Sequence, residues 1–286
     1  MGLGFQTVTH PQPLGPDARP PITAHPATGG AVQEFLAGFR LLLRGLGLYV
    51  SNPRLMLLGL IPALISGVVY LAAFGTLFYF ISDIAAAITP FADGWEEGLQ
   101  EVVRLAVAVA VLGVVVLVGM LTFTAITLVI GDPFYEKISE AVENRYGGVP
   151  NEIDLPWHTS IRLSLADSIR LIGLTVLCGI PLFLLGFIPL IGQTVVPVVG
   201  GLVGGWFLAI ELSGFPFYRR GLRLADRRRV LRAHRPAALG FGVGVFVCFL
   251  IPLGAILVTP AAVAGAALLS RRALGFPIEH GGQRVN

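Results

Sequence analysis

Long apolar runs alternate with short polar segments along this chain, and two of the runs are long enough to cross a lipid bilayer as helices. The first run covers residues 55–81, and the second covers residues 105–130 and contains no charged residue. About 20 helical residues cross the hydrocarbon core of a bilayer. The pattern therefore predicts two transmembrane helices, joined by an acidic loop at 82–103.

Two later apolar regions are each interrupted by an Ile-Pro-Leu sequence, at 188–190 and at 251–253. The arms of the second region contain about 13 and 17 residues, and at about 1.5 Å per residue the first arm is only about 20 Å long. The hydrocarbon core is roughly 30 Å thick. The pattern therefore favours two re-entrant helical hairpins, whose tips meet inside the protein, over ordinary spans kinked by proline. The predicted tip residues are Pro189, Gly192, Pro252 and Gly254.

Two shorter segments have one apolar and one polar face. Residues 34–50 place Arg40 and Arg44 four positions apart, on one side of a helix, and predict a helix that lies on the membrane surface. Apolar residues recur every four positions in 134–146 and predict a second, separate amphipathic helix. The doubled Gly-x-x-x-Gly pattern at 200–205 allows two helices to approach closely, either between hairpin arms or across a homo-oligomer.

The composition is that of an integral membrane protein. Of the 286 residues 55% are hydrophobic and 13% are charged, and the mean hydropathy is +0.79. A soluble domain usually contains about 25% charged residues. We therefore expect an all-α membrane domain at 34–272, between a disordered Pro-rich N-terminal tail at 1–33 and a C-terminal tail at 273–286.

The basic residues are distributed in a way that orients the chain. Residues 219–235 carry eight arginines and one aspartate, and Arg271 and Arg272 follow the last apolar arm. Basic residues beside membrane helices stay on the cytoplasmic side, so both termini are expected in the cytoplasm. The arginines at 219–235 are also expected to bind anionic lipid headgroups. Because the net charge is only +3, the distribution does not indicate nucleic-acid binding.

No motif in the chain indicates catalysis. The sequence contains no HExxH, Walker loop, GxSxG or CxxC pattern. Its two cysteines, Cys178 and Cys248, lie in apolar runs without metal-ligand spacing, and its five histidines are scattered. We therefore expect no enzyme activity, no cofactor and no metal site.

Several blocks of residues together resemble a known family. Residues 186–217, GFIPLIGQTVVPVVGGLVGGWFLAIELSGFPF, resemble the CysZ sulfate permeases, which belong with the etoposide-induced 2.4 membrane-protein superfamily. DPFYEKISEAVE at 132–143 and TPAAVAGA at 259–266 are similar to further segments of that family. The resemblance covers residues 34–272. It implies two long spans, two hemi-penetrating hairpins and uptake of sulfate for cysteine synthesis, without a nucleotide-binding subunit.

The resemblance also indicates where an anion would bind. The family's sulfate-binding arginine pair falls on Met56 and Leu57, and Arg54 lies two residues earlier. The family's GLLAE motif corresponds to residues 136–140. A guanidinium has paired donors suited to an oxyanion, so Arg54 is the first candidate ligand. The further candidates for the anion site are Lys137, Ser139 and Gln193.

Two functions fit these observations. The first is an inner-membrane permease or channel for sulfate or a related oxyanion. The intact IGQT block favours this hypothesis. The second is a membrane scaffold or membrane-shaping protein of the same fold that does not transport. The apolar residues at the arginine-pair positions favour this second hypothesis.

Overall fold

The computed structural model describes residues 29–150, 152, 157–251 and 253–279, and these residues form helices without any strand. The all-α prediction is confirmed over this part of the chain. Most of the predicted N-terminal tail and residues 280–286 lie outside the described residues. The first helix, α1 (Ala31–Val50), begins three residues before the expected start of the membrane domain.

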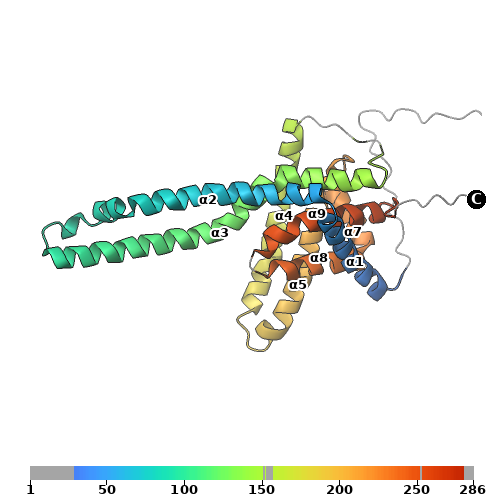
Figure 1. The fold of residues 1–286 in the computed structure, drawn as a ribbon. Helices are drawn as coiled ribbons and strands as arrows, with labels where there is room; N and C mark the ends of the chain where they lie inside the picture. Colours follow the sequence, from blue (N-terminus) through green and yellow to red (C-terminus); the bar gives the residue numbers. More distant parts are fainter. Residues whose placement is uncertain (1–28, 151, 153–156, 252, 280–286) are drawn as a thin grey trace, which may run out of the picture.

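The two predicted spans form the longest helices of the structure. Helices α2 (Pro53–Ile88) and α3 (Glu97–Arg145) run antiparallel, side by side, and project far from the rest of the molecule (Figure 1). A short 3₁₀ helix, η1 (Pro90–Ala92), connects them. The side chain of Asn52 caps α2 by accepting a hydrogen bond from the Arg54 amide at 3.1 Å. The acidic segment around η1 therefore lies at the end of this pair opposite to Asn52.

The amphipathic segment at 134–146 is not a separate helix, which corrects the prediction. Helix α3 continues through Pro133 to Arg145. Beyond the proline, Tyr135, Ile138 and Val142 are all buried in the main apolar core. Proline removes one backbone donor from a helix interior. Burial of the face that follows it compensates for that loss, so the helix continues where the sequence pattern indicated a break.

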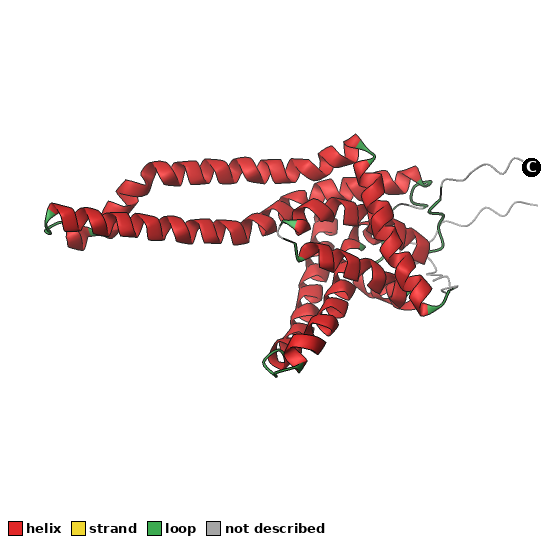
Figure 2. Cartoon of the chain, turned by 60° about the horizontal axis from the view of Figure 1, so that its bottom comes forward, coloured by secondary structure: helices red, strands yellow, loops and turns green. Residues whose placement is uncertain are grey.

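The two predicted hairpins are present as paired helices. The first consists of α4 (Trp157–Leu185) and α5 (Ile191–Leu212), and the second of α8 (Arg235–Phe249) and α9 (Gly254–Ala273). Between them lie α6 (Gly214–Tyr218) and α7 (Leu224–Ala233). The α4–α5 hairpin leaves the body in a different direction from the α2–α3 pair, as Figures 1 and 2 both show.

Each hairpin tip turns on a leucine with left-handed backbone and a closely packed glycine. Leu190 and Leu253 have φ values of 68° and 61°. A Cβ on Gly192 would lie 2.1 Å from the Gly186 carbonyl oxygen, and one on Gly254 would lie 2.1 Å from the Cys248 oxygen. Glycine is therefore required at both places. Pro189 lies in the first turn, and Pro252 lies outside the described residues.

The expectation that the two tips meet inside the protein is wrong. Leu190 is 76% exposed and Leu253 is 57% exposed. The tips need no protein cover because each turn pairs its own backbone: the Gly192 amide donates to Ile188 O and the Gly254 amide to Ile251 O, both at 2.8 Å. An exposed leucine at a tip is suited to contact with lipid.

The core is built around α9, which is buried along most of its length. Helices α1, α3 and α8 pack on it, and α5 packs on the outer side of α8. Small residues allow these contacts: a Cβ on Gly205 would lie 2.6 Å from the Val243 nitrogen, and one on Gly204 would lie 2.8 Å from the Phe246 ring. The predicted role of the Gly-x-x-x-Gly pattern in packing hairpin arms is confirmed for Gly204 and Gly205, whereas a Cβ on Gly200 would meet no atom within 4 Å.

Within the part of the chain that the structure describes, five helical segments are long and apolar enough to cross a membrane: α2, α3, residues 166–185 of α4, α5 and α9. The first four expose apolar side chains along their length, whereas α9 is covered by protein. Helix α8, with 15 residues, is shorter. The chain is therefore a multi-pass membrane protein. The partial insertion of the hairpins stays a prediction.

Candidate functional site

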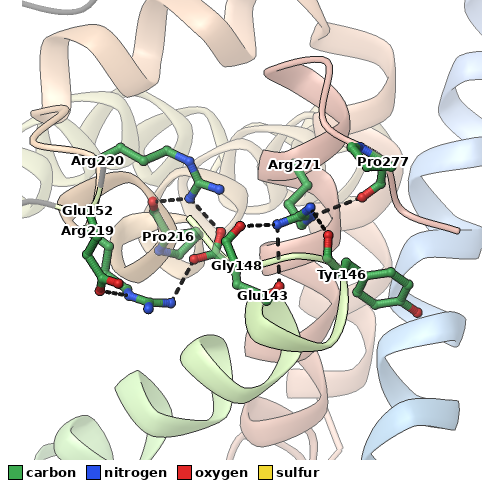
Figure 3. Close-up of polar contacts among 9 residues, drawn as sticks. All are labelled: Glu143, Tyr146, Gly148, Glu152, Pro216, Arg219, Arg220, Arg271 and Pro277. Carbon is green, nitrogen blue, oxygen red and sulfur yellow. Dashed lines mark hydrogen bonds and ion pairs between the residues drawn. The ribbon is translucent and has the colours of Figure 1, made fainter. Parts of the chain in front are cut away.

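Buried charged groups gather where the end of α3, the segment after α6 and the end of α9 converge (Figure 3). We call the buried residues Glu143, Arg220 and Arg271, together with the nearly buried Arg219 and the exposed Glu152 that binds it, the Glu143 cluster. The Glu143 carboxylate is completely buried. Arg219 Nη1 donates to its Oε2 at 2.9 Å, and Arg220 Nη1 donates to its Oε1 at 2.5 Å. One carboxylate therefore joins two neighbouring arginines to α3.

Helical spacing explains why Glu143 points inward. It lies on the same stripe of α3 as Ser139 and Val142, both of which are buried. Residues three and four positions apart share a helix face. A carboxylate on a buried face needs a cationic partner, because an unpaired buried charge is very costly. This is the signal by which the sequence could have predicted an ion pair at Glu143.

Arg271 closes the cluster from α9. Its Nη1 donates to Gly148 O at 2.7 Å, its Nη2 donates to Tyr146 O, and its Nε donates to Pro277 O at 3.0 Å. The arginine is 2% exposed. It thereby satisfies carbonyl groups in the turn after α3 and holds the segment that follows α9 against that turn.

Positive charge exceeds negative charge in the cluster, which contains three arginines and two glutamates. Burial by itself lowers the pKa of Arg219, but the hydrogen bond to Glu152 and the charges of Glu143 and Glu152 raise that pKa above its ordinary value. Among the described residues, the Nε and Nη2 atoms of Arg220 find no acceptor although both are buried. The cluster therefore retains unused guanidinium donors, the groups that bind oxyanions best.

An aromatic ring covers part of this excess charge. The Arg220 Cζ atom lies 5.3 Å from the centroid of the Phe276 ring, and the Arg271 Cζ atom lies 5.8 Å from it. A ring face attracts a guanidinium, most strongly where water is excluded. Phe276 thus stabilises Arg220, which is paired with the buried Glu143 carboxylate, and Arg271, which donates to backbone carbonyls.

The four candidate anion ligands from the sequence do not form one site. Arg54 is exposed in the first turn of α2, and Gln193 is exposed in the first turn of α5. The start of α2 and the tip of the α4–α5 hairpin lie apart in Figure 1. Lys137 is exposed, whereas Ser139, two residues later, is buried with its hydroxyl lacking a described partner. Neighbours two apart on a helix face different sides. Their role in anion binding stays a prediction.

The described residues contain no group of three or more histidine, cysteine, aspartate or glutamate side chains suited to hold a metal ion. Cys178 and Cys248 are both free thiols. The chemistry that this part of the chain offers is instead electrostatic: guanidinium groups held at fixed places by carboxylates, carbonyls and rings.

Comparison with known proteins identifies the family of the chain. Residues 41–260 match the family model described as "Sulfate transporter CysZ/Etoposide-induced protein 2.4". The chain is 30% identical over 244 residues to the sulfate transporter CysZ of Pectobacterium atrosepticum, an alignment that covers 85% of this chain and 84% of that protein. It is 32% identical over 248 residues to the sulfate transporter CysZ of Pseudomonas fluorescens, covering 84% and 95% of the two chains. The chain therefore belongs to the sulfate transporter CysZ/etoposide-induced protein 2.4 family.

Proposed function

We propose that the chain is an inner-membrane permease or channel that moves sulfate, or a related oxyanion, to supply sulfur assimilation. The observation that carries the proposal is its family membership, since relatives named as sulfate transporters align with it over most of both chains. The exposed apolar surfaces of α2 to α5 place such a molecule in a bilayer. Both termini and residues 219–235 would then face the cytoplasm.

The electrostatics of the structure support this proposal. The Glu143 cluster holds more guanidinium groups than carboxylates, and Arg220 retains two buried donors without a described acceptor. Arg54 stands at the start of α2 with an exposed side chain, close in the chain to the Asn52 cap. We propose Arg54 as a ligand on the entry path, with Lys137, Ser139 and Gln193 as further contacts for the anion.

In this proposal α2 and α3 span the bilayer and the two hairpins enter it only in part. Helix α8 contains 15 residues. At about 1.5 Å per residue it is about 22 Å long, too short for a hydrocarbon core of roughly 30 Å. Helix α9 is long enough, but it is buried within the protein and does not face lipid.

A scaffold of the same fold is the second candidate. The family's sulfate-binding arginine pair corresponds to Met56 and Leu57, and these side chains are apolar and are 42% and 60% exposed. At these two positions the chain therefore presents a surface suited to lipid instead of donors suited to an anion. A protein that shaped or organised the membrane would keep the helices without needing that site.

Sulfate uptake into proteoliposomes separates the two candidates. Purified protein is reconstituted, and uptake of radiolabelled sulfate is compared with that of empty liposomes and of Arg54→Ala and Arg40→Ala proteins. Arg40 is a matched control because it is an exposed arginine on α1. We expect uptake that Arg54→Ala reduces at least about tenfold and Arg40→Ala leaves unchanged, since a charged hydrogen bond contributes about 1.5–3 kcal/mol. Absence of uptake by folded, inserted protein would support the scaffold instead.

A further inference from the structure

The arginines at 219–235 divide into two groups with different surroundings. Arg219 and Arg220 pair with Glu143, and Arg227 is 3% exposed with its Cζ atom 5.3 Å from the Tyr218 ring. The side chains of these three arginines point into the protein and make contacts there. The group turned outward is Arg223, Arg228, Arg229, Arg232 and Arg235, of which Arg228 is half-buried and the others are exposed.

Arg228 borders a groove between α4 and α7. The groove has a volume of about 470 Å³. Its walls are formed by Arg170, Gly173, Leu174 and Leu177 from α4, and by Leu224, Ala225 and Arg228 from α7. Arg170 and Arg228, which are distant in the sequence, thus line the same apolar groove.

The α4 wall changes from charged to apolar along a single stripe. Arg170, Gly173, Leu174 and Leu177 are spaced i, i+3, i+4 and i+7, so they share one helix face. At about 1.5 Å per residue the stripe is about 10 Å long. Leu177 is 66% exposed, and the exposed apolar surface of α4 continues beyond it. The groove therefore leads from a cationic end directly onto a surface that faces lipid.

A buried carboxylate holds the two walls together. Asp167 of α4 is 1% exposed, and its Oδ2 accepts a hydrogen bond from the Leu224 amide at the start of α7, at 3.1 Å. Arg170 approaches the same carboxylate only at 3.9 Å and is 69% exposed. Asp167 thereby positions α7 against α4 and leaves most of the Arg170 guanidinium open to another anion.

We propose that this groove binds one anionic phospholipid, with the phosphate held by Arg170 and Arg228 and an acyl chain lying over Gly173 toward Leu177. A lipid fits better than a free anion because only a molecule with a charged head and an apolar tail matches the change along the stripe. Glycine at 173 leaves the hollow open: a Cβ there would meet no atom within 4 Å. The two arginines supply charge, and the α4 surface supplies the apolar contact.

The test measures lipid retention by native mass spectrometry of the full chain in detergent, with phosphatidylglycerol and phosphatidylcholine added in turn. The charge variant is Arg170→Gln/Arg228→Gln. Its matched control, Arg229→Gln/Arg232→Gln, removes the same charge from exposed positions on α7 outside the groove. A third variant, Gly173→Leu, fills the hollow without altering charge.

We expect the charge variant to weaken phosphatidylglycerol binding about 30-fold, from the electrostatic contribution of two arginines near an anionic lipid. The control should change binding less than threefold, and Gly173→Leu should also weaken it. The proposal is overturned if the control loses as much binding as the charge variant, or if phosphatidylcholine binds as tightly as phosphatidylglycerol. Displacement of the lipid by millimolar inorganic phosphate would likewise overturn it, because the site would then be one for a free anion.

Discussion

Replacing Glu143 with glutamine tests whether the Glu143 cluster stabilises the junction of α3, the segment after α6 and the end of α9. Glutamine keeps the shape of glutamate and one acceptor oxygen but removes the negative charge. The carboxylate is completely buried, and the side chains of its partners Arg219 and Arg220 are 10% and 7% exposed. The substitution therefore leaves two nearly buried guanidinium groups without their shared counter-charge.

The expected loss follows from this burial. Removing one partner of a buried ion pair costs about 3–5 kcal/mol, because the remaining charge is left uncompensated. For a chain of this size that corresponds to a decrease in the melting temperature of about 6–20 °C. Glu152→Gln is the matched control, because it removes a carboxylate that binds Arg219 at 2.7 Å but is 45% exposed. An exposed pair contributes at most about 1 kcal/mol, so the control should lose only a few degrees.

The assay is intrinsic tryptophan fluorescence during heating of the detergent-solubilised protein, with all variants measured at one scan rate. A third protein, Glu143→Gln/Arg220→Gln, removes the Glu143 carboxylate together with one of its cationic partners, Arg220. It should melt above Glu143→Gln alone, because one of the two desolvated cations is gone and the other, Arg219, still pairs with Glu152. Equal melting temperatures for Glu143→Gln and Glu152→Gln would refute the reasoning, since burial would then make no difference.

Two further predictions concern helix packing and hairpin depth. Gly242→Ala should lower the melting temperature by several degrees, because its Cβ would lie 1.8 Å from Gly205 O; Gly200→Ala, whose Cβ would meet nothing within 4 Å, should have no such effect. In a cysteine-free background, Leu190→Cys should stay unlabelled by an impermeant thiol reagent added outside cells. Gly94→Cys, in the exposed acidic loop, should react. Equal labelling of the two would indicate that the first hairpin spans the bilayer.

The sequence predicts the helices well because apolar run length determines them. The two longest apolar runs lie within α2 and α3. Both hairpin turns occur where proline and glycine interrupt a later run. The error at Pro133 has a physical cause: the pattern shows the missing donor but not the burial of Tyr135, Ile138 and Val142 that compensates for it. Local signals indicate helix ends only where tertiary contacts do not override them.

The arginines at 219–235 show a second limit. Their number predicts which side of the membrane they occupy, but that number does not distinguish an arginine turned inward from one turned outward. Arg219 and Arg220 are committed to Glu143, which is distant in sequence. Arg228 and Arg170 line the same groove, where Asp167 of α4 binds the start of α7. Contacts of this kind depend on how helices are placed, and no spacing within one segment contains that information.

The two hairpins illustrate a signal in the sequence that apolarity alone does not carry. Their tips share an Ile-Pro-Leu sequence and a glycine packed on the preceding arm, yet α4 lies open while α9 forms the core. The arms differ in side-chain size: residues 261–267 of α9 read AAVAGAA, whereas residues 180–185 of α4 read IPLFLL. Small side chains let neighbouring helices approach closely, and large apolar ones cover surface that faces lipid. Side-chain volume, considered together with apolarity, therefore indicates which arm is packed by protein and which is left to the membrane.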